Sequence, residues 1–118
     1  MSYREVADLP VVRAFVRARA RAFGLAPDRA ELLTLAVSEL VTNTLQHTTG
    51  AGQVSLWVAA GQLLCDVVDS GPLRALGRAM PPPDAEGGRG LAIVERVCDE
   101  VTTMASSAGT LVRLRFAL

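Results

Sequence analysis

Apolar residues recur at helical spacing over two stretches in the first half of the chain. The first stretch is Leu9–Phe23, and Gly24 just beyond it is a typical residue for ending a helix. The second opens at Pro27, a residue that suits the first turn of a helix, and runs to about Thr48. The pattern therefore predicts two successive helices.

Alternation of apolar and polar residues then predicts four strands. Two of them lie over residues 54–59 and 63–69, with a turn at Gly61 and Gln62 between them. Two more close the chain, over Val101–Ala105 and Thr110–Ala117, and turn-prone residues join them. In the last run apolar residues alternate with arginine, which is typical of an antiparallel strand with one buried face.

The segment Ser70–Gly90 is rich in glycine and proline and has little periodicity. Compact domains seldom keep so long an irregular segment unless it is functional, so we expect a lid over residues 72–90. A third helix should start near Gly90 and turn four residues inward, namely Leu91, Val94, Val97 and Cys98. Because the elements do not alternate as βαβ units, the predicted fold class is α+β. It is a two-layer sandwich, a mixed and mainly antiparallel sheet covered on one face by about three helices.

Composition narrows the class of protein further. The 118 residues, half of them hydrophobic, fit a single domain over residues 1–118. The twelve basic residues are all arginine, which excludes the lysine-dependent Walker A loop. They are balanced by twelve acidic residues, which argues against nucleic-acid binding. No apolar run approaches the about 20 residues that cross a bilayer, so we expect a cytoplasmic protein without membrane contact.

The cysteine and histidine content excludes a tetrahedral zinc site. The chain has two cysteines and one histidine, fewer than the about four ligands that such a site needs. We expect Cys65 and Cys98 to be reduced and to lie buried as small hydrophobic residues.

Glu39 and Asn43 are one helical turn apart, so they project from the same face of the second predicted helix. That helix is apolar almost all round, and burying a polar group without a partner costs about 1–3 kcal/mol. The pair therefore indicates a functional site. An exposed pair at a frayed helix end is the alternative interpretation.

Two further clusters have chemistry suited to a nucleotide. Asp69 ends an apolar run and can accept a hydrogen bond from an exocyclic amine, while Gly71 lets a flat base approach the backbone. The glycine-rich loop Glu86–Leu91 runs into the third predicted helix, where backbone N–H groups can cradle an anion. Taken alone, the first cluster is also an ordinary turn and the second an ordinary hinge.

In order and spacing these clusters resemble the motifs of the GHKL (Bergerat-fold) ATPases, with Gly109 and Thr110 as the last motif. Within that superfamily the runs Ser38–His47, Asp69–Pro72 and Glu86–Val94 are most similar to the stand-alone anti-sigma-factor serine kinases and their actinobacterial relatives. The similarity covers nearly the whole chain.

The resemblance implies ATP and Mg²⁺ as ligands and a role for each motif residue. Asn43 would coordinate Mg²⁺, and Glu39 would act as general base or orient the attacking group. Asp69 would read the adenine amino group. The other nucleotide-binding residues would be Gly71 and Thr110 near the adenine, and His47, Gly88, Arg89, Gly90 and Leu91 near the phosphates. A water-exposed position at the helix end is equally consistent with His47.

Three departures from the family pattern bear on activity. Thr44 stands where alanine usually follows the motif asparagine, which would crowd the phosphate side. Leu73 replaces a common glycine, which would stiffen the lid. The chain begins almost at its first helix, so we expect the edge strand ahead of that helix to be short or missing. These departures leave open whether the protein turns over ATP and whether it forms a homodimer through that edge of the sheet.

By this resemblance the expected function is that of an anti-sigma factor and serine/threonine protein kinase. Its partners would be a sigma factor and a STAS-type anti-anti-sigma protein, which it would phosphorylate. A non-catalytic nucleotide-binding switch and a detached histidine-kinase-type ATPase domain are the alternatives. We expect no phosphoacceptor helices upstream of this domain, and the length of the sequence argues against a gyrase-type ATPase. An acceptor at Asp69 predicts a preference for ATP over GTP.

Overall fold

A computed structural model describes residues 1–47, 51–69, 93–106 and 109–118 of the chain. In this part five strands form one sheet, and all neighbouring strands are antiparallel. Their order across the sheet is β1-β2-β3-β5-β4. The strands are β1 (Ser2–Tyr3), β2 (Gly52–Ala59), β3 (Gln62–Asp69), β4 (Glu100–Ser106) and β5 (Gly109–Ala117).

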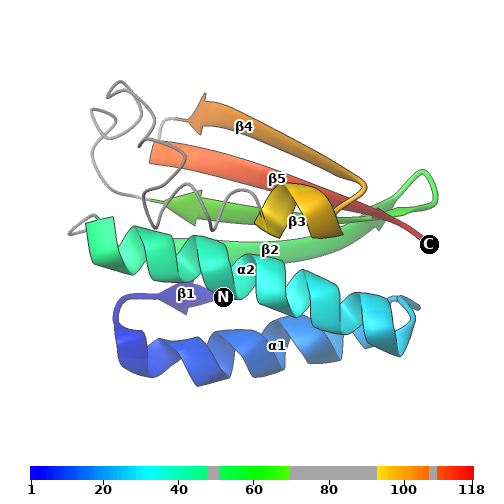
Figure 1. Ribbon diagram of the computed structural model, residues 1–118, viewed down its shortest axis with the longest axis horizontal. Coiled ribbons are helices and arrows are strands. Elements are labelled where there is room, and N and C mark those ends of the chain that lie inside the picture. Colours follow the sequence, from blue (N-terminus) through cyan, green and yellow to red (C-terminus); the bar gives the residue numbers. More distant parts are fainter. Residues whose placement is uncertain (48–50, 70–92, 107–108) are drawn as a thin grey trace.

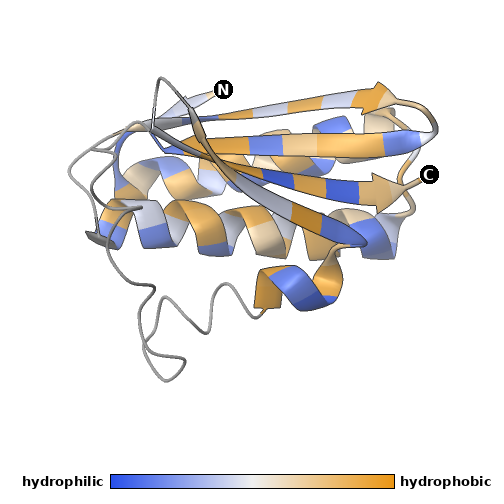
Figure 2. Ribbon diagram, turned by 90° about the horizontal axis from the view of Figure 1, so that it is seen from above, coloured by the Kyte–Doolittle hydropathy of each residue, from blue (hydrophilic) through white to orange (hydrophobic). Residues whose placement is uncertain are grey.

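The helices pack on one face of the sheet, which gives two layers (Figure 1 and Figure 2). A 3-10 turn, η1 (Val6–Asp8), leads into α1 (Leu9–Ala22), and α2 (Pro27–His47) follows. Residues 93–97 are also helical. Both views place α2 between α1 and this last helical stretch. The structure thus confirms the predicted α+β two-layer sandwich, although the described strands form a wholly antiparallel sheet rather than a mixed one.

The hydrophobic core lies between the sheet and the helices. Alternate residues of β3, namely Leu63, Cys65 and Val67, are buried in it. Because side chains alternate across a strand, the odd-numbered residues of β3 face the helices and the even-numbered ones face away. This alternation decides which side of the sheet carries the predicted site residues.

Polar contacts orient α1 against α2 beside the core. Arg13 Nε donates a hydrogen bond to Ser38 Oγ at 3.0 Å, and Arg17 pairs with Glu31 through two hydrogen bonds. These contacts lie on the side of α2 that faces α1. Since exposed ion pairs add little stability, apolar burial in the core holds the two helices together.

The boundaries of the first two helices and of the four predicted strands agree with the sequence prediction to within two residues, and the largest difference is the start of β2 at Gly52 rather than Val54. The turn between β2 and β3 lies at Ala60 and Gly61, one residue earlier than predicted. Both residues have positive φ, 52° and 75°, as a two-residue turn between antiparallel strands requires. The edge strand expected to be short or missing is present as the two residues of β1. The predicted lid over residues 72–90 lies outside the described ranges.

The third predicted helix is confirmed in part. Val94 and Cys98 are buried in the core and Val97 packs against it, whereas Leu91 lies outside the described residues. Cys65 and Cys98 are free thiols, as predicted, and burial raises the pKa of both, to about 12 for Cys98. No helix in the described ranges is both long and apolar enough to cross a membrane.

Candidate functional site

One row of directly opposed residues crosses all five strands near one end of the sheet. In strand order the row is Tyr3, Gly52, Asp69, Thr110 and Ala105. Directly opposed residues of antiparallel strands point to the same face of a sheet. Since Val67 is buried against the helices, Asp69 two residues later faces the helices as well.

Asp69 and Thr110 are therefore neighbours on the helix side of the sheet. Both are half-buried, and their Cβ atoms are expected about 4.5–5.5 Å apart, as in other opposed pairs. A carboxylate and a hydroxyl at this spacing can accept and donate hydrogen bonds along the edge of a heterocyclic base. The strand register thus brings together two of the three residues that the family resemblance assigns to adenine, and the third, Gly71, lies outside the described residues.

Glu39 and Asn43 lie one turn apart on α2, and both are half-buried. Helix α2 continues to His47, so the interpretation of a frayed helix end is wrong. The same face carries Leu32 and Leu35, which are 39% and 42% exposed. Ala36 on the same face is fully buried, so among the described residues this face of α2 is buried in part and exposed in part.

Sequence reasoning missed Tyr3. Its side chain is fully buried, its hydroxyl donates to the Val68 carbonyl oxygen at 3.2 Å, and the Thr44 side chain hydrogen-bonds to it. Desolvation raises the pKa of Tyr3, the hydrogen bond with Thr44 lowers it, and the charge of Asp69 raises it. The part of α2 beside Asn43 and the end of β3 therefore meet at one phenol hydroxyl.

Thr44 packs between α2 and the sheet. Its side chain is buried, and Oγ1 donates a hydrogen bond to the Leu40 carbonyl oxygen at 3.1 Å. A side-chain hydrogen bond also joins Thr44 to Tyr3 of β1. The extra methyl and hydroxyl groups relative to alanine are thus used in the contact between helix and sheet, and the expected crowding of the phosphate side stays a prediction.

The remaining predicted site residues are outside the described part of the chain. These are Gly71, Gly88, Arg89, Gly90 and Leu91, together with the side chain of His47. Their assignment to the adenine and the phosphates stays a prediction.

The donor chemistry at Glu39 and Asn43 fits a magnesium ion held mainly by a nucleotide. Among the described residues, no group of three histidine, cysteine or acidic side chains is placed to hold a metal. In nucleotide sites Mg²⁺ usually takes one or two protein oxygens and completes its shell with phosphate oxygens and water. The Asn43 amide oxygen is a donor of this kind, and the Glu39 carboxylate one turn away stays free to act as the predicted base.

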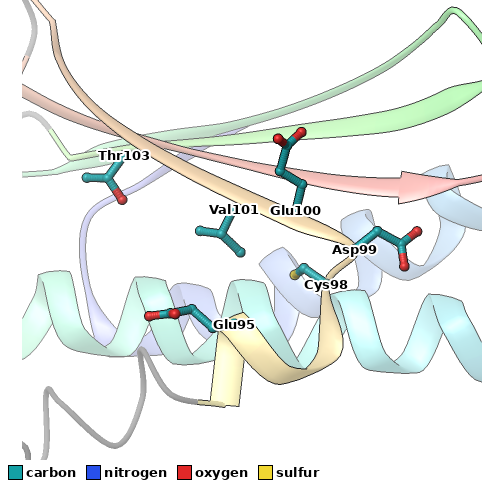
Figure 3. A pocket seen from close by; sticks show the side chains of 6 residues that line it. All are labelled: Glu95, Cys98, Asp99, Glu100, Val101 and Thr103. Atoms are coloured by element: carbon teal, nitrogen blue, oxygen red, sulfur yellow. The ribbon is translucent and has the colours of Figure 1, made fainter.

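A separate pocket of about 320 Å³ opens between residues 95–98 and β4 (Figure 3). It is lined by Glu95, Cys98, Asp99, Glu100, Val101 and Thr103. Two of its carboxylates already have partners, since Asp99 pairs with Arg29 and Glu100 with Arg115. The pocket contains none of the predicted site residues, so we do not assign the nucleotide to it.

The two-layer fold and the placement of these residues define an ATP-binding domain of the GHKL class. The chain belongs to the family of histidine kinase-like ATPase domains, whose profile matches residues 4–116. A comparison with curated protein sequences finds no significant match.

Solved structures of histidine kinases are similar to this chain. The histidine kinase domain of the Erythrobacter litoralis EL346 blue-light activated histidine kinase shares 29% identity, with a TM-score of 0.60 over 80% of this chain. A second structure of the same kinase shares 28% identity, with a TM-score of 0.57 over 79% of this chain. The match spans 46% and 31% of those two chains, less than half of either.

Proposed function

We propose that this chain binds ATP with Mg²⁺ and acts as an anti-sigma factor and serine/threonine protein kinase. Its substrate would be a serine or threonine of a STAS-type anti-anti-sigma protein, and a sigma factor would be its second partner. The ATP-binding class follows from the family, whereas the protein partners are supported by the resemblance of the Ser38–His47 run to anti-sigma kinases.

The observation that carries the nucleotide assignment is the strand register. It sets Asp69 opposite Thr110 on the helix side of the sheet. Through Tyr3, the same end of the sheet contacts α2 at Thr44, the neighbour of Asn43. An adenine at Asp69 and phosphates near Asn43 would then lie along one continuous surface between the two layers.

The proposed transfer uses few groups of the protein. The hydroxyl of the partner attacks the γ-phosphorus, and its proton passes to the Glu39 carboxylate. The bond from the γ-phosphorus to the bridging oxygen breaks, and ADP leaves with that electron pair. Among the described residues Glu39 is half-buried, so part of its side chain is accessible. Phosphoryl transfer depends mainly on such positioning and on charge stabilisation.

Two measurements test the proposal. Calorimetry should show binding of Mg·ATP and Mg·ADP with much weaker binding of Mg·GTP, because the acceptor at Asp69 faces a carbonyl in guanine. Radiolabelled ATP should label a STAS protein with the wild-type chain but far less with Glu39→Gln. The matched control is Glu31→Gln, an exposed carboxylate on the same helix that pairs with Arg17. Equal labelling by Glu39→Gln and wild type would remove Glu39 from the reaction.

The similarity to histidine kinases supports a second candidate, an ATP-binding domain that phosphorylates a histidine on a separate phosphoacceptor. The acid stability of the product separates the two, since phosphoserine survives acid and phosphohistidine does not. Nucleotide binding without transfer to either acceptor would favour the non-catalytic switch.

A further inference from the structure

The two-residue strand β1 carries the only tyrosine of the chain, and that side chain is fully buried. Tyr3 is directly opposite Gly52 on β2. A Cβ atom at Gly52 would overlap both the Tyr3 hydroxyl and the Val68 carbonyl oxygen. Glycine at this position therefore provides the space through which the phenol ring reaches across β2 to β3.

The Tyr3 hydroxyl joins two elements at the end of that reach. It donates a hydrogen bond to the Val68 carbonyl oxygen at 3.2 Å, and the Thr44 side chain hydrogen-bonds to the same hydroxyl. Val68 immediately precedes Asp69 on β3, and Thr44 immediately follows Asn43 on α2. The Tyr3 hydroxyl therefore contacts the chain neighbour of Asp69, which is assigned to the adenine. It also contacts the chain neighbour of Asn43, which is assigned to the phosphate end.

The Thr44 hydroxyl carries one proton, which it can donate either to the Leu40 carbonyl oxygen one turn earlier in α2 or to the Tyr3 oxygen. Because the Tyr3 proton goes to Val68, Thr44 is the donor when the two hydroxyls bond to each other. The contact of Thr44 with Tyr3 and the contact of Tyr3 with Val68 together span the interface between helix and sheet.

We propose that Tyr3 is a positioning residue of the nucleotide site, whose hydroxyl fixes the end of β3 against α2 and so sets the spacing between Asp69 and Asn43. The inference rests on the proposed binding of ATP at these residues. On this proposal β1 belongs to the nucleotide site although it does not touch the nucleotide. By reciprocity, bound nucleotide should in turn strengthen the attachment of β1 to the sheet.

Tyr3→Phe removes the hydroxyl and keeps the ring over Gly52. We expect calorimetry to show Mg·ADP binding weakened by about fivefold or more, the effect of one hydrogen bond of average strength. Thr44→Val should weaken Mg·ADP binding to a similar extent. The double variant should lose less than the product of the two single effects, because both changes remove the same contact.

A matched control on the same helix separates positioning from general stability. Thr34 is also buried, and its hydroxyl donates to the carbonyl oxygen four residues earlier, Ala30, at 2.7 Å. Thr34→Val should therefore lower the melting temperature by about as much as Thr44→Val but leave the affinity for Mg·ADP unchanged. An equal loss of affinity in Thr34→Val and Thr44→Val would overturn the proposal.

Spectroscopy provides a readout that a purely structural role would not move. Because Tyr3 is the only tyrosine, a ¹³C label at tyrosine Cζ gives one resonance from this site. That resonance should shift when Mg·ADP is added to the wild-type chain. An unchanged resonance at saturating Mg·ADP would contradict the proposal.

The outcomes also separate this inference from the proposed function. If the wild-type chain binds no adenine nucleotide, the proposed function fails and the inference fails with it. If the wild-type chain binds Mg·ADP and both Tyr3→Phe and Thr44→Val bind it equally well, only the positioning role of Tyr3 is wrong. Should Tyr3→Phe not fold, Thr44→Val alone decides the question.

Discussion

Asp69 on β3 and Thr110 on β5 are directly opposed in the antiparallel ladder, and both face the helices. They are separated by 41 positions in the chain, and the segment between them includes the predicted lid. The ladder fixes their relative position through backbone hydrogen bonds along eight opposed pairs of β3 and β5. Two residues that recognise a ligand are held more rigidly on interior strands of a sheet than on loops.

Asp69→Asn should weaken Mg·ADP binding by at least about tenfold, because one carboxylate oxygen acceptor is replaced by an amide donor facing the adenine amine. Asp66→Asn is the matched control. It lies three residues earlier on β3 but on the opposite face of the sheet, where Asp66 pairs with Arg113. Calorimetry on both variants checks this, and a similar loss in Asp66→Asn would show that the effect is not local to the helix side.

Gly52→Ala should destabilise the fold strongly. A Cβ atom there would overlap the Val68 carbonyl oxygen, which belongs to the backbone and cannot rotate away, and the Tyr3 hydroxyl. Overpacking of this kind typically costs about 1–3 kcal/mol. Urea unfolding with Gly61→Ala as control checks the cause. Gly61 has φ of 75° and open space around its Cβ position, so only backbone strain is expected there. A smaller loss in Gly52→Ala than in Gly61→Ala would contradict the overlap.

Much of the fold could be predicted because its periodic signals are strong. The alternation in the last strand identified β5, in which Leu114 and Phe116 are fully buried. The helical spacing from Leu9 gave the start of α1 correctly. The turn after β2 was misplaced by one residue, because Ala60 adopts a positive φ that its residue type does not favour.

The site could be predicted only in part, since its geometry depends on contacts between distant segments. The hydrogen bond from Tyr3 to Val68 joins residues 65 positions apart, and no local pattern around Tyr3 indicates it. The sequence left the exposure of Glu39 open between two interpretations for a related reason. Apolar neighbours such as Leu35 indicate burial in a sequence, whereas burial depends on which side of α2 meets the sheet.

The face of the sheet that points away from the helices carries a cluster of three side chains, Asp66, Arg113 and Trp57, which should contribute to stability. Arg113 donates two hydrogen bonds to Asp66, at 2.8 and 2.9 Å, and its guanidinium lies 5.1 Å from the centroid of the Trp57 ring. The Asp66 side chain is only 11% exposed. Removing one partner would leave a largely buried charge unpaired, so Arg113→Met should destabilise the fold by about 1–3 kcal/mol.

Trp57 is the only tryptophan of the chain, so its fluorescence reports on this cluster. The emission should change in Arg113→Met, and urea unfolding monitored at the same wavelength gives the loss of stability. Arg4→Met is the control, because Arg4 is exposed and follows Tyr3, which is opposite Gly52, five residues along β2 from Trp57. Emission from Trp57 that is the same in both variants would contradict the stacking of Arg113 on the ring.

The buried thiols predict a loss of stability at alkaline pH. Burial raises the pKa of Cys65 and Cys98 in the folded chain, whereas thiols of an unfolded chain titrate near about pH 8.5. Below that pH both states keep these protons. As the pH rises above about 8.5 the unfolded chain loses them first, so the free energy of unfolding should fall by up to about 1.4 kcal/mol per pH unit for each thiol.

Urea unfolding between about pH 7.5 and pH 10 measures this slope. In the Cys65→Ala/Cys98→Ala variant the stability at neutral pH should be lower, because small cavities replace the thiols, but the alkaline slope should be much reduced. The raised pKa of Tyr3 adds a similar loss only above about pH 10, where a free phenol begins to ionise. A double variant that keeps the wild-type slope below pH 10 would show that other groups cause the alkaline loss.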